Sequence, residues 1–146
     1  MATGPTELAV FQVGPITGAL DIGDIQEINK HLDITAVFNA PPCVRGVLNL
    51  RGRIITVIDL REKLGLPTRE LDATMRIIVV ADGEEHIGLL VDRILDVTPV
   101  DPARLEAPPS HIRGVSGAYF ASIYKMDDGL AAILDIAAVL GQEEHA

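Results

Sequence analysis

The sequence contains little cysteine and few aromatic residues. Cys43 is the only cysteine, and the aromatic residues are three Phe and two Tyr, with no Trp. A single cysteine excludes an intramolecular disulfide and a thiolate metal site, and it is typical of a chain kept in a reducing compartment. Grooves that bind proline-rich peptides use several aromatic side chains, so this composition argues against a general peptide-binding module of that kind.

Long apolar runs and an excess of positive charge are also missing. Apolar stretches such as Ile77–Ala81 are far shorter than the ~20 residues of a membrane-spanning helix. Lys and Arg number 12 against 21 Asp and Glu, a net charge of −9, and this argues against nucleic acid or anionic membranes as partners. Met1–Thr6 lacks the features of a signal peptide, so a cytoplasmic protein is expected.

The chain does contain a series of short apolar segments bounded by Gly, Pro or polar residues. Such runs, rich in Val, Ile and Leu, are typical of the strands of a barrel or sandwich. The segments are Leu8–Val13, Gly18–Ile22, Val44–Leu50, Ile54–Ile58, Met75–Ala81, Ile87–Val91, Tyr119–Tyr124 and Leu130–Leu134. Asp82-Gly83 and Asp128-Gly129 predict tight hairpins, because Asp-Gly favours positive φ. The fold class is therefore predicted to be all-β.

A short helix is predicted after the segment that ends at Ile58. Asp59 can cap its first turn, Glu62 stands at the position of a reciprocal capping box, and Gly65 can end it. These signals leave room for only one or two helical turns.

The order of the segments repeats within the chain. Val57-Ile58-Asp59-Leu60 matches Ile133-Leu134-Asp135-Ile136, and a Leu-Gly pair follows in both places. Three further matches keep the same order: Gly18-Ala19-Leu20 with Gly88-Leu89-Leu90, Ile25-Gln26-Glu27-Ile28 with Ile94-Leu95-Asp96-Val97, and Ala40–Val47 with Ala107–Val115. Chance similarity between β-rich segments is the alternative explanation.

The repeat predicts one domain, residues 1–146, made of two pseudo-repeats at about 7–66 and 75–141. Each unit is predicted to be hairpin, strand, Pro-Pro corner, hairpin and short capped helix. A change of offset after the Arg-Gly-Val matches predicts a longer hairpin in the second unit, between Gly117 and Leu130. Because each unit is small for independent stability, we expect two barrels that share a core, with strand pairing across the halves.

Enzyme motifs are mostly absent. No phosphate-binding glycine loop occurs, and Gly114–Ala118 lacks the second glycine of a nucleophile elbow. The histidines are too scattered to form a local metal site: His31, His86, His111 and His145. Cys43 has no supporting catalytic pattern, and a small buried thiol is the ordinary interpretation. No metal and no cofactor are therefore expected.

Asp59 and Asp135 offer one catalytic alternative. One aspartate per half could meet its counterpart as a carboxylate dyad, as in aspartic proteases, and make the chain a small hydrolase. The Thr-Gly or Ser-Gly that should follow each aspartate is missing, and both residues stand where a helix needs an N-cap.

Arg51-Gly52 is predicted to form the tip of a hairpin between two apolar strands. Gly52 can adopt positive φ there, and Arg51 would present a planar guanidinium at a rigid tip. A solvated turn and a partner-binding arginine are both compatible with this spacing.

Four blocks of the sequence together resemble the CheW family, the coupling proteins of bacterial chemosensory arrays. The blocks are Asp24–Ile28, Val44–Gly52, Ile54–Arg61 and His86–Asp92. The resemblance runs from about Glu7 to Gly141. It implies two intertwined five-stranded SH3-like barrels around a shared core, with short capped helices. Thr17 and Thr56 depart from the family pattern at strand positions, where they should leave the fold unchanged.

The resemblance also implies a function without catalysis. Family members bridge the cytoplasmic hairpin tip of a chemoreceptor to the regulatory domain of a CheA-type histidine kinase, so the protein would associate with membrane receptor arrays through protein partners and without inserting into the membrane. The implied receptor-binding residues are Ile25, Glu27, Ile28, Gly46, Val47 and Arg51. No short motif marks the kinase contacts, and flagellar, surface-motility and gene-regulatory pathways all remain open.

Overall fold

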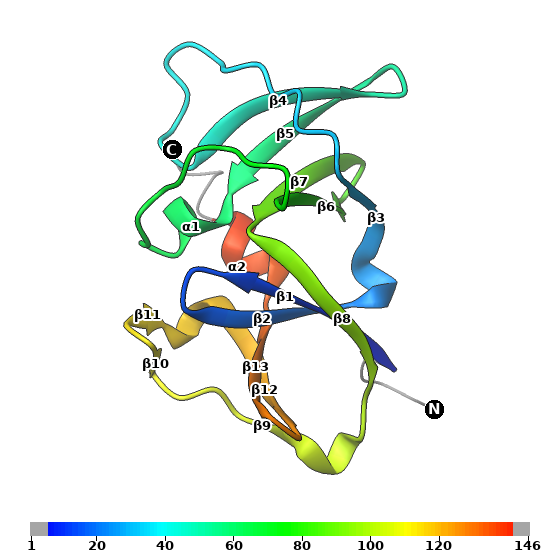
Figure 1. Cartoon of the computed structure of the whole chain (residues 1–146), viewed down its shortest axis with the longest axis vertical. Helices are drawn as coiled ribbons and strands as arrows, with labels where there is room; N and C mark the ends of the chain where they lie inside the picture. The colour runs from blue at the N-terminus through cyan, green and yellow to red at the C-terminus, as the bar shows by residue number, and fades with distance from the viewer. Residues whose placement is uncertain (1–5, 142–146) are drawn as a thin grey trace.

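The computed structural model describes residues 6–141, which form two β-barrels stacked on each other (Figure 1). The lower barrel is a six-stranded sheet in the order β8-β1-β2-β13-β12-β9, with a separate two-stranded pair, β10-β11, beside it. Its strands are β1 (Glu7–Val13), β2 (Ile16–Asp21), β8 (Arg93–Pro99), β9 (Leu105–Glu106), β12 (Phe120–Met126) and β13 (Gly129–Leu134), and the pair is β10 (His111–Ile112) and β11 (Val115–Ser116).

The upper barrel is a five-stranded sheet in the order β3-β6-β7-β5-β4. Its strands are β3 (Ile25–Asn29), β4 (Val44–Leu50), β5 (Arg53–Asp59), β6 (Arg76–Asp82) and β7 (Glu85–Val91). Neighbouring strands are antiparallel except in two places, where β5 pairs with β7 and β2 pairs with β13 in parallel. The predicted all-β class is thus confirmed.

The halves of the chain exchange their first hairpins. The β1-β2 hairpin belongs to the lower barrel, and the chain then crosses through the short 3₁₀ helix η1 (Ile22–Asp24) into β3 of the upper barrel. The β6-β7 hairpin belongs to the upper barrel, and the chain returns through Asp92 into β8 of the lower barrel (Figure 1). Each sheet therefore contains strands from both halves, which intertwines the barrels.

Three apolar clusters hold this arrangement together. The largest lies between the sheets and includes Phe11, Ile58, Leu89 and Leu134, so both barrels share a core. The other two clusters fill the barrel interiors, with Ile55 and its neighbours in the upper barrel and a set from β1, β2, β12 and β13 in the lower barrel. Each sheet can contribute apolar side chains to two clusters, because successive side chains of a strand point to opposite faces of the sheet.

Besides η1, the described part of the chain contains four short helices. They are the α-helices α1 (Leu60–Lys63) and α2 (Ile136–Gly141) and the 3₁₀ helices η2 (Pro102–Arg104) and η3 (Gly117–Tyr119). Asp59 caps α1 as predicted, accepting a hydrogen bond from the Arg61 N–H at 3.0 Å. The reciprocal capping box does not form, because the Asp59 N–H donates to the Cys43 carbonyl at 2.7 Å instead of to Glu62. None of the helices in the described residues is long and apolar enough to cross a membrane.

The strand registers change the predicted alignment of the two halves. Val44 lies opposite Ile58 in the β4-β5 hairpin, and Phe120 lies opposite Leu134 in the β12-β13 hairpin. Both hairpins have a bulge next to this pair and the same two-residue loop, so the prediction of a longer second hairpin is wrong. The extra residues precede β12, and the Arg-Gly-Val match is not a structural one. The shared element order supports the duplication, which stays an inference.

Candidate functional site

Arg51 stands on a tightly constrained turn between β4 and β5. Its φ is 54° and that of Gly52 is 81°, the positive pair that a two-residue hairpin loop of type I′ requires. The side-chain oxygen of Asn49 accepts a hydrogen bond from the Gly52 N–H at 3.0 Å and fixes the loop further. The predicted hairpin tip is therefore confirmed, and the Arg51 side chain is 74% exposed there.

Glu27 and Arg51 form an ion pair across the open edge of the upper barrel. β3 carries Glu27 and lies at one edge of the five-stranded sheet, whereas β4 ends next to Arg51 at the other edge. Arg51 Nη1 lies 2.5 Å from Glu27 Oε1, and the hydrogen bond to Glu27 raises the pKa of Arg51. The curled sheet thus brings two predicted site residues together although they are far apart in the sequence.

The ion pair lies at the mouth of a hollow of about 300 Å³. The lining residues are Gln26, Glu27, Leu50, Arg51, Arg53, Ile55, Val79 and His86. Ile55 and Val79 belong to the apolar interior of the upper barrel, so the hollow has an apolar floor and a charged rim. The guanidinium of Arg53 contacts the ring of His86 on the same rim. This combination suits a protein partner that offers an apolar side chain together with polar groups.

The other predicted site residues are not gathered at this mouth. Ile25 is half-buried against the shared core, and Ile28 is 39% exposed on β3. Gly46 is buried in β4, and Val47 exchanges two backbone hydrogen bonds of 2.8 Å with Thr35. Of the six residues, Glu27 and Arg51 touch each other, while the remaining four line strands β3 and β4.

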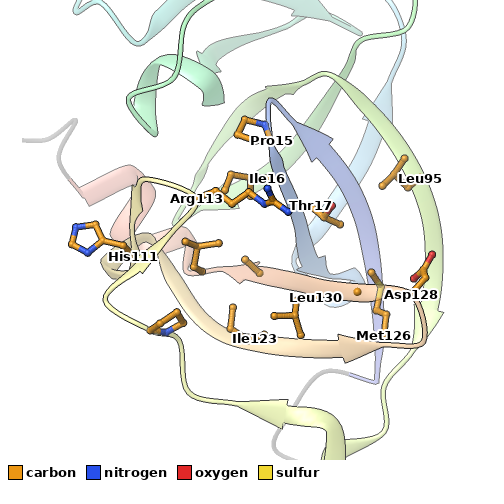
Figure 2. Close-up of a pocket in the computed structure, with 14 residues that line it drawn as sticks. Pro15, Ile16, Thr17, Leu95, His111, Arg113, Ile123, Met126, Asp128 and Leu130 are labelled. Carbon is orange, nitrogen blue, oxygen red and sulfur yellow. The ribbon is translucent and has the colours of Figure 1, made fainter.

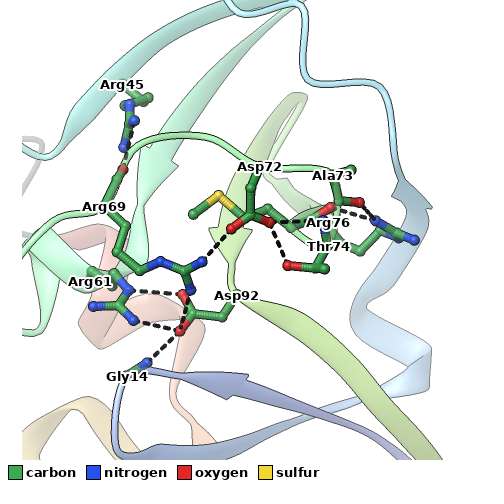
Figure 3. A network of polar contacts seen from close by, with 10 residues as sticks. Gly14, Arg45, Arg61, Arg69, Asp72, Ala73, Thr74, Arg76 and Asp92 are labelled. Carbon is green, nitrogen blue, oxygen red and sulfur yellow. Dashed lines mark hydrogen bonds and ion pairs between the residues drawn. The ribbon is translucent and has the colours of Figure 1, made fainter.

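Asp92 is the centre of a polar network that joins the two barrels (Figure 3). Arg61 on α1 binds it with both ends of its guanidinium, Nε to Oδ1 at 2.8 Å and Nη2 to Oδ2 at 2.7 Å. The Gly14 N–H, in the β1-β2 turn of the lower barrel, donates to Oδ2 at 2.9 Å, and Arg69 Nη1 lies 3.5 Å from the same oxygen. We call Arg61, Asp92 and Gly14 the latch.

Burial and hydrogen bonding act in opposite directions on Asp92. Burial by itself raises the pKa of this carboxyl, but the hydrogen bonds from Arg61 and from the Gly14 N–H, together with the positive charges of Arg61 and Arg69, outweigh it and the net pKa is lowered. The carboxylate therefore stays ionised in the latch. No local sequence signal marks this contact, although Arg61 and Asp92 each end a block that resembles the CheW family.

The predicted Asp59 and Asp135 dyad does not gain support from the geometry. Asp59 caps α1 and pairs with Arg45 at 2.8 Å, and Asp135 accepts a hydrogen bond from the Ala138 N–H of α2 at 3.1 Å. Each carboxylate thus serves its own helix. Among the described residues no group of three His, Cys, Asp or Glu side chains could hold a metal ion, and His145 lies outside these residues.

A second hollow, of about 650 Å³, opens in the lower barrel (Figure 2). It lies between the β1-β2 turn, β8, the β12-β13 hairpin and the segment around β10, and its lining includes Ile16, Ile123 and Met126. Leu95 and Leu130 on its rim are 44% and 59% exposed. Sequence analysis assigned no role to these residues, because exposed leucines on strands look the same in sequence as buried ones.

Known proteins are similar to this chain in architecture and in sequence. The family model described as CheW-like domain matches residues 7–144. The chain belongs to the CheW-like domain family. The chemotaxis protein CheW of Bacillus subtilis is 33% identical over 137 residues, covering 94% of this chain and 88% of that protein. The chemotaxis protein CheW of Thermotoga maritima is 33% identical over 131 residues, covering 89% and 84%.

A solved structure agrees with the fold of this CheW-like chain. The crystal structure of the scaffolding protein TtCheW from Thermoanaerobacter tengcongensis superposes with a TM-score of 0.84 at 32% identity, covering 95% of this chain and 90% of that one. The predicted pair of SH3-like barrels is thereby confirmed. The sheet of the lower barrel has six strands where five were expected, because the short strand β9 pairs with β12. The relatives support a scaffold or coupling role in chemotaxis signalling for this CheW-like protein.

Proposed function

We propose that this protein is a non-catalytic adaptor that couples the cytoplasmic tip of a chemoreceptor to the regulatory domain of a CheA-type histidine kinase. The observation that carries the proposal is the Glu27–Arg51 pair, held on a rigid turn at the mouth of the upper barrel. An exposed guanidinium that is already oriented loses little side-chain entropy when it binds a partner. The family of the chain supports the same direction.

The receptor tip is a helical hairpin, and strands β3 and β4 offer the features that such a partner needs. Ile25, Ile28 and Val47 would face its apolar stripe, Gly46 would support this face by letting Thr35 pack closely against β4, and Glu27 with Arg51 would fix the orientation of the partner. An amphipathic helix binds an apolar surface in this way, while charged groups at the rim set orientation and specificity.

The kinase contact is proposed at the hollow of the lower barrel. This hollow lies on a different barrel from the Glu27–Arg51 pair, so one partner need not displace the other. The exposed Leu95 and Leu130 provide apolar area on its rim. Each contact alone would be small and transient, and repeated contacts in an array would supply the strength. The alternative within the same class of function is an adaptor of a surface-motility or gene-regulatory pathway.

Reconstitution tests the proposal. The protein is mixed with its cognate kinase, with and without a receptor cytoplasmic fragment, and the rate of kinase autophosphorylation is measured. We expect a receptor-dependent increase only when this protein is present. An unchanged rate, with all three proteins folded and mixed at micromolar concentrations, would contradict an adaptor function.

A further inference from the structure

The two halves carry different polar side chains at positions where their backbones correspond. The β4-β5 hairpin with α1 and the β12-β13 hairpin with α2 share the same register 76 residues apart. Their corresponding backbone hydrogen bonds also match, from Asp59 N to Cys43 O at 2.7 Å and from Asp135 N to Tyr119 O at 2.9 Å. The counterparts that follow from this register are Asp59 with Asp135, Arg45 with Ala121, and Arg61 with Ala137.

Arg45 and Arg61 of the first half thus correspond to alanines in the second. Arg45 pairs with the carboxylate of Asp59 at 2.8 Å, but Ala121 offers no such group to Asp135. The Asp135 carboxylate accepts the Ala138 N–H at 3.1 Å, and no cation of the described residues pairs with it.

The latch is missing from the second half as well. The β1-β2 and β6-β7 hairpins share one register 69 residues apart, so the counterpart of Gly14 is Gly83. By the same offset, the counterpart of Asp92 is Gly23. Both residues lie where the chain crosses between the barrels, Gly23 on the way to the upper barrel and Asp92 on the way back to the lower one. Arg61 and Asp92 fill the space beside Gly14, whereas Ala137 and Gly23 leave the space beside Gly83 empty.

The result is a hollow of about 590 Å³ beside α2, lined by residues of both barrels. Figure 1 shows α2 between the two barrels. Gly23, Gly83, Ala121 and Ala137 all line it. Leu134 and Leu140 supply buried apolar side chains, and the carboxylates of Asp24, Asp82 and Asp135 also line the hollow. None of the described residues that line this hollow carries a positive charge.

We propose that this hollow is a docking surface for a protein segment that inserts an arginine beside an apolar side chain, the guanidinium binding Asp135 as Arg45 binds Asp59. A guanidinium fork matches a carboxylate in geometry, and its methylene stem can pack on the apolar floor. Burial and the negative charge of Asp21 raise the pKa of Asp24, and the proximity of these two carboxylates adds negative potential at the near edge of the hollow. None of the six proposed receptor-binding residues lines this hollow, although Gln26 lines both it and the hollow beside the Glu27–Arg51 pair.

A metal ion is not the occupant that these carboxylates favour. Although Asp24, Asp82 and Asp135 line one hollow, no three acidic or ligating side chains of the described residues come close enough to hold a metal. Three spread carboxylates around an apolar floor instead fit an extended group with a delocalised charge.

The test selects a display library of random 16-residue peptides on the full chain and measures the affinity of synthetic copies by fluorescence anisotropy. Two variants examine the hollow: Asp135→Asn, which removes the charge but keeps a good N-cap, and Ala121→Arg, which places an arginine where the first half has one. We expect arginine next to an apolar residue in the selected peptides, and binding at least tenfold weaker to both variants. The Ala121→Arg protein should unfold at the same temperature as the wild type or higher.

Ala36→Arg is the matched control, because Ala36, like Ala121, is exposed, and it lies outside the hollow. It should bind the selected peptides as the wild type does. Selected peptides without arginine, or peptides that bind Ala121→Arg and Asp135→Asn as tightly as the wild type, overturn the proposal. Receptor-dependent kinase activation should be normal in both hollow variants, which separates this outcome from failure of the adaptor function.

Discussion

Arg51 and Glu27 connect the two edge strands of the upper barrel, with Nη1 and Oε1 2.5 Å apart. The arginine comes from a turn whose backbone is already constrained, and the glutamate comes from β3, next to the crossover between the barrels. The pair is solvent-accessible and therefore adds little to folding stability. Its value lies in presenting two opposite charges at fixed positions to a partner.

Replacing Arg51 by Ala, or Glu27 by Ala, should weaken receptor binding about tenfold or more, as expected for an oriented charged contact. The melting temperature should stay within error of the wild type, because both side chains reach solvent. Titration of a receptor cytoplasmic fragment measures the affinity. Arg104→Ala is the control, since Arg104 pairs with Asp127 at 2.9 Å on the lower barrel. Equal binding by Arg51→Ala and wild type would remove this pair from the receptor site.

Leu130→Glu should reduce kinase binding at least tenfold, because a charge would replace apolar area on the rim of the lower hollow. Leu130 is 59% exposed, so folding should be unaffected. Leu71→Glu makes the same change at a 38% exposed leucine in the segment between the halves and should bind normally. Kinase co-purification with each variant measures the difference. If both variants bind alike, the kinase contact lies elsewhere.

Arg61→Ala should lower the free energy of unfolding by about 3 kcal/mol, since it leaves a largely buried carboxylate without its bidentate partner. Chemical denaturation measures this value. Arg104→Ala, which breaks an exposed pair, should cause no measurable change. A loss as small for Arg61→Ala as for Arg104→Ala would show that the latch does not hold the barrels together.

The lowered pKa of Asp92 predicts a dependence of stability on pH. A carboxyl whose pKa is lower in the folded state stabilises the fold above its unfolded pKa, and this contribution is lost as the pH falls from about 4 through the folded value. Asp92→Asn should therefore be less stable than wild type at pH 7 and lose less stability than wild type between about pH 4 and pH 2. Parallel acid-unfolding profiles for the two proteins would contradict this assignment.

Gly46→Ala should destabilise the fold by more than about 3 kcal/mol, because a Cβ there would lie 2.2 Å from the Thr35 carbonyl oxygen and φ is 151°. Gly52→Ala also has positive φ but meets open space, so about 1 kcal/mol is expected. Denaturation curves compare the two. Similar values would show that β4 can move away from Thr35, and only then could a binding defect of Gly46→Ala be attributed to contact with a receptor.

Local signals in the sequence predicted local structure well. Asp82-Gly83 marked a hairpin that the structure contains, and Asp59 caps α1 as expected. The same aspartate shows the limit of such signals. Its N–H is taken by Cys43, which lies 16 residues earlier, so the local capping box that Glu62 predicted cannot form.

Contacts between distant segments could not be predicted in this way. Arg61 and Asp92 are 31 residues apart and belong to no shared periodic pattern, so only the folded chain shows that they form the latch. Matching residue letters also misled the alignment of the halves, because Arg45 is equivalent to Ala121 by strand register and not to Arg113. Backbone register identifies the counterparts, whereas residue identity at a turn does not.

The most direct test of the adaptor function is the autophosphorylation rate of the cognate kinase in mixtures with a receptor cytoplasmic fragment and wild-type, Arg51→Ala or Arg104→Ala protein. Activation is expected with wild type and with Arg104→Ala, and a large loss of activation is expected with Arg51→Ala despite normal kinase binding. Equal activation by all three, or activation in the absence of this protein, would contradict the adaptor function.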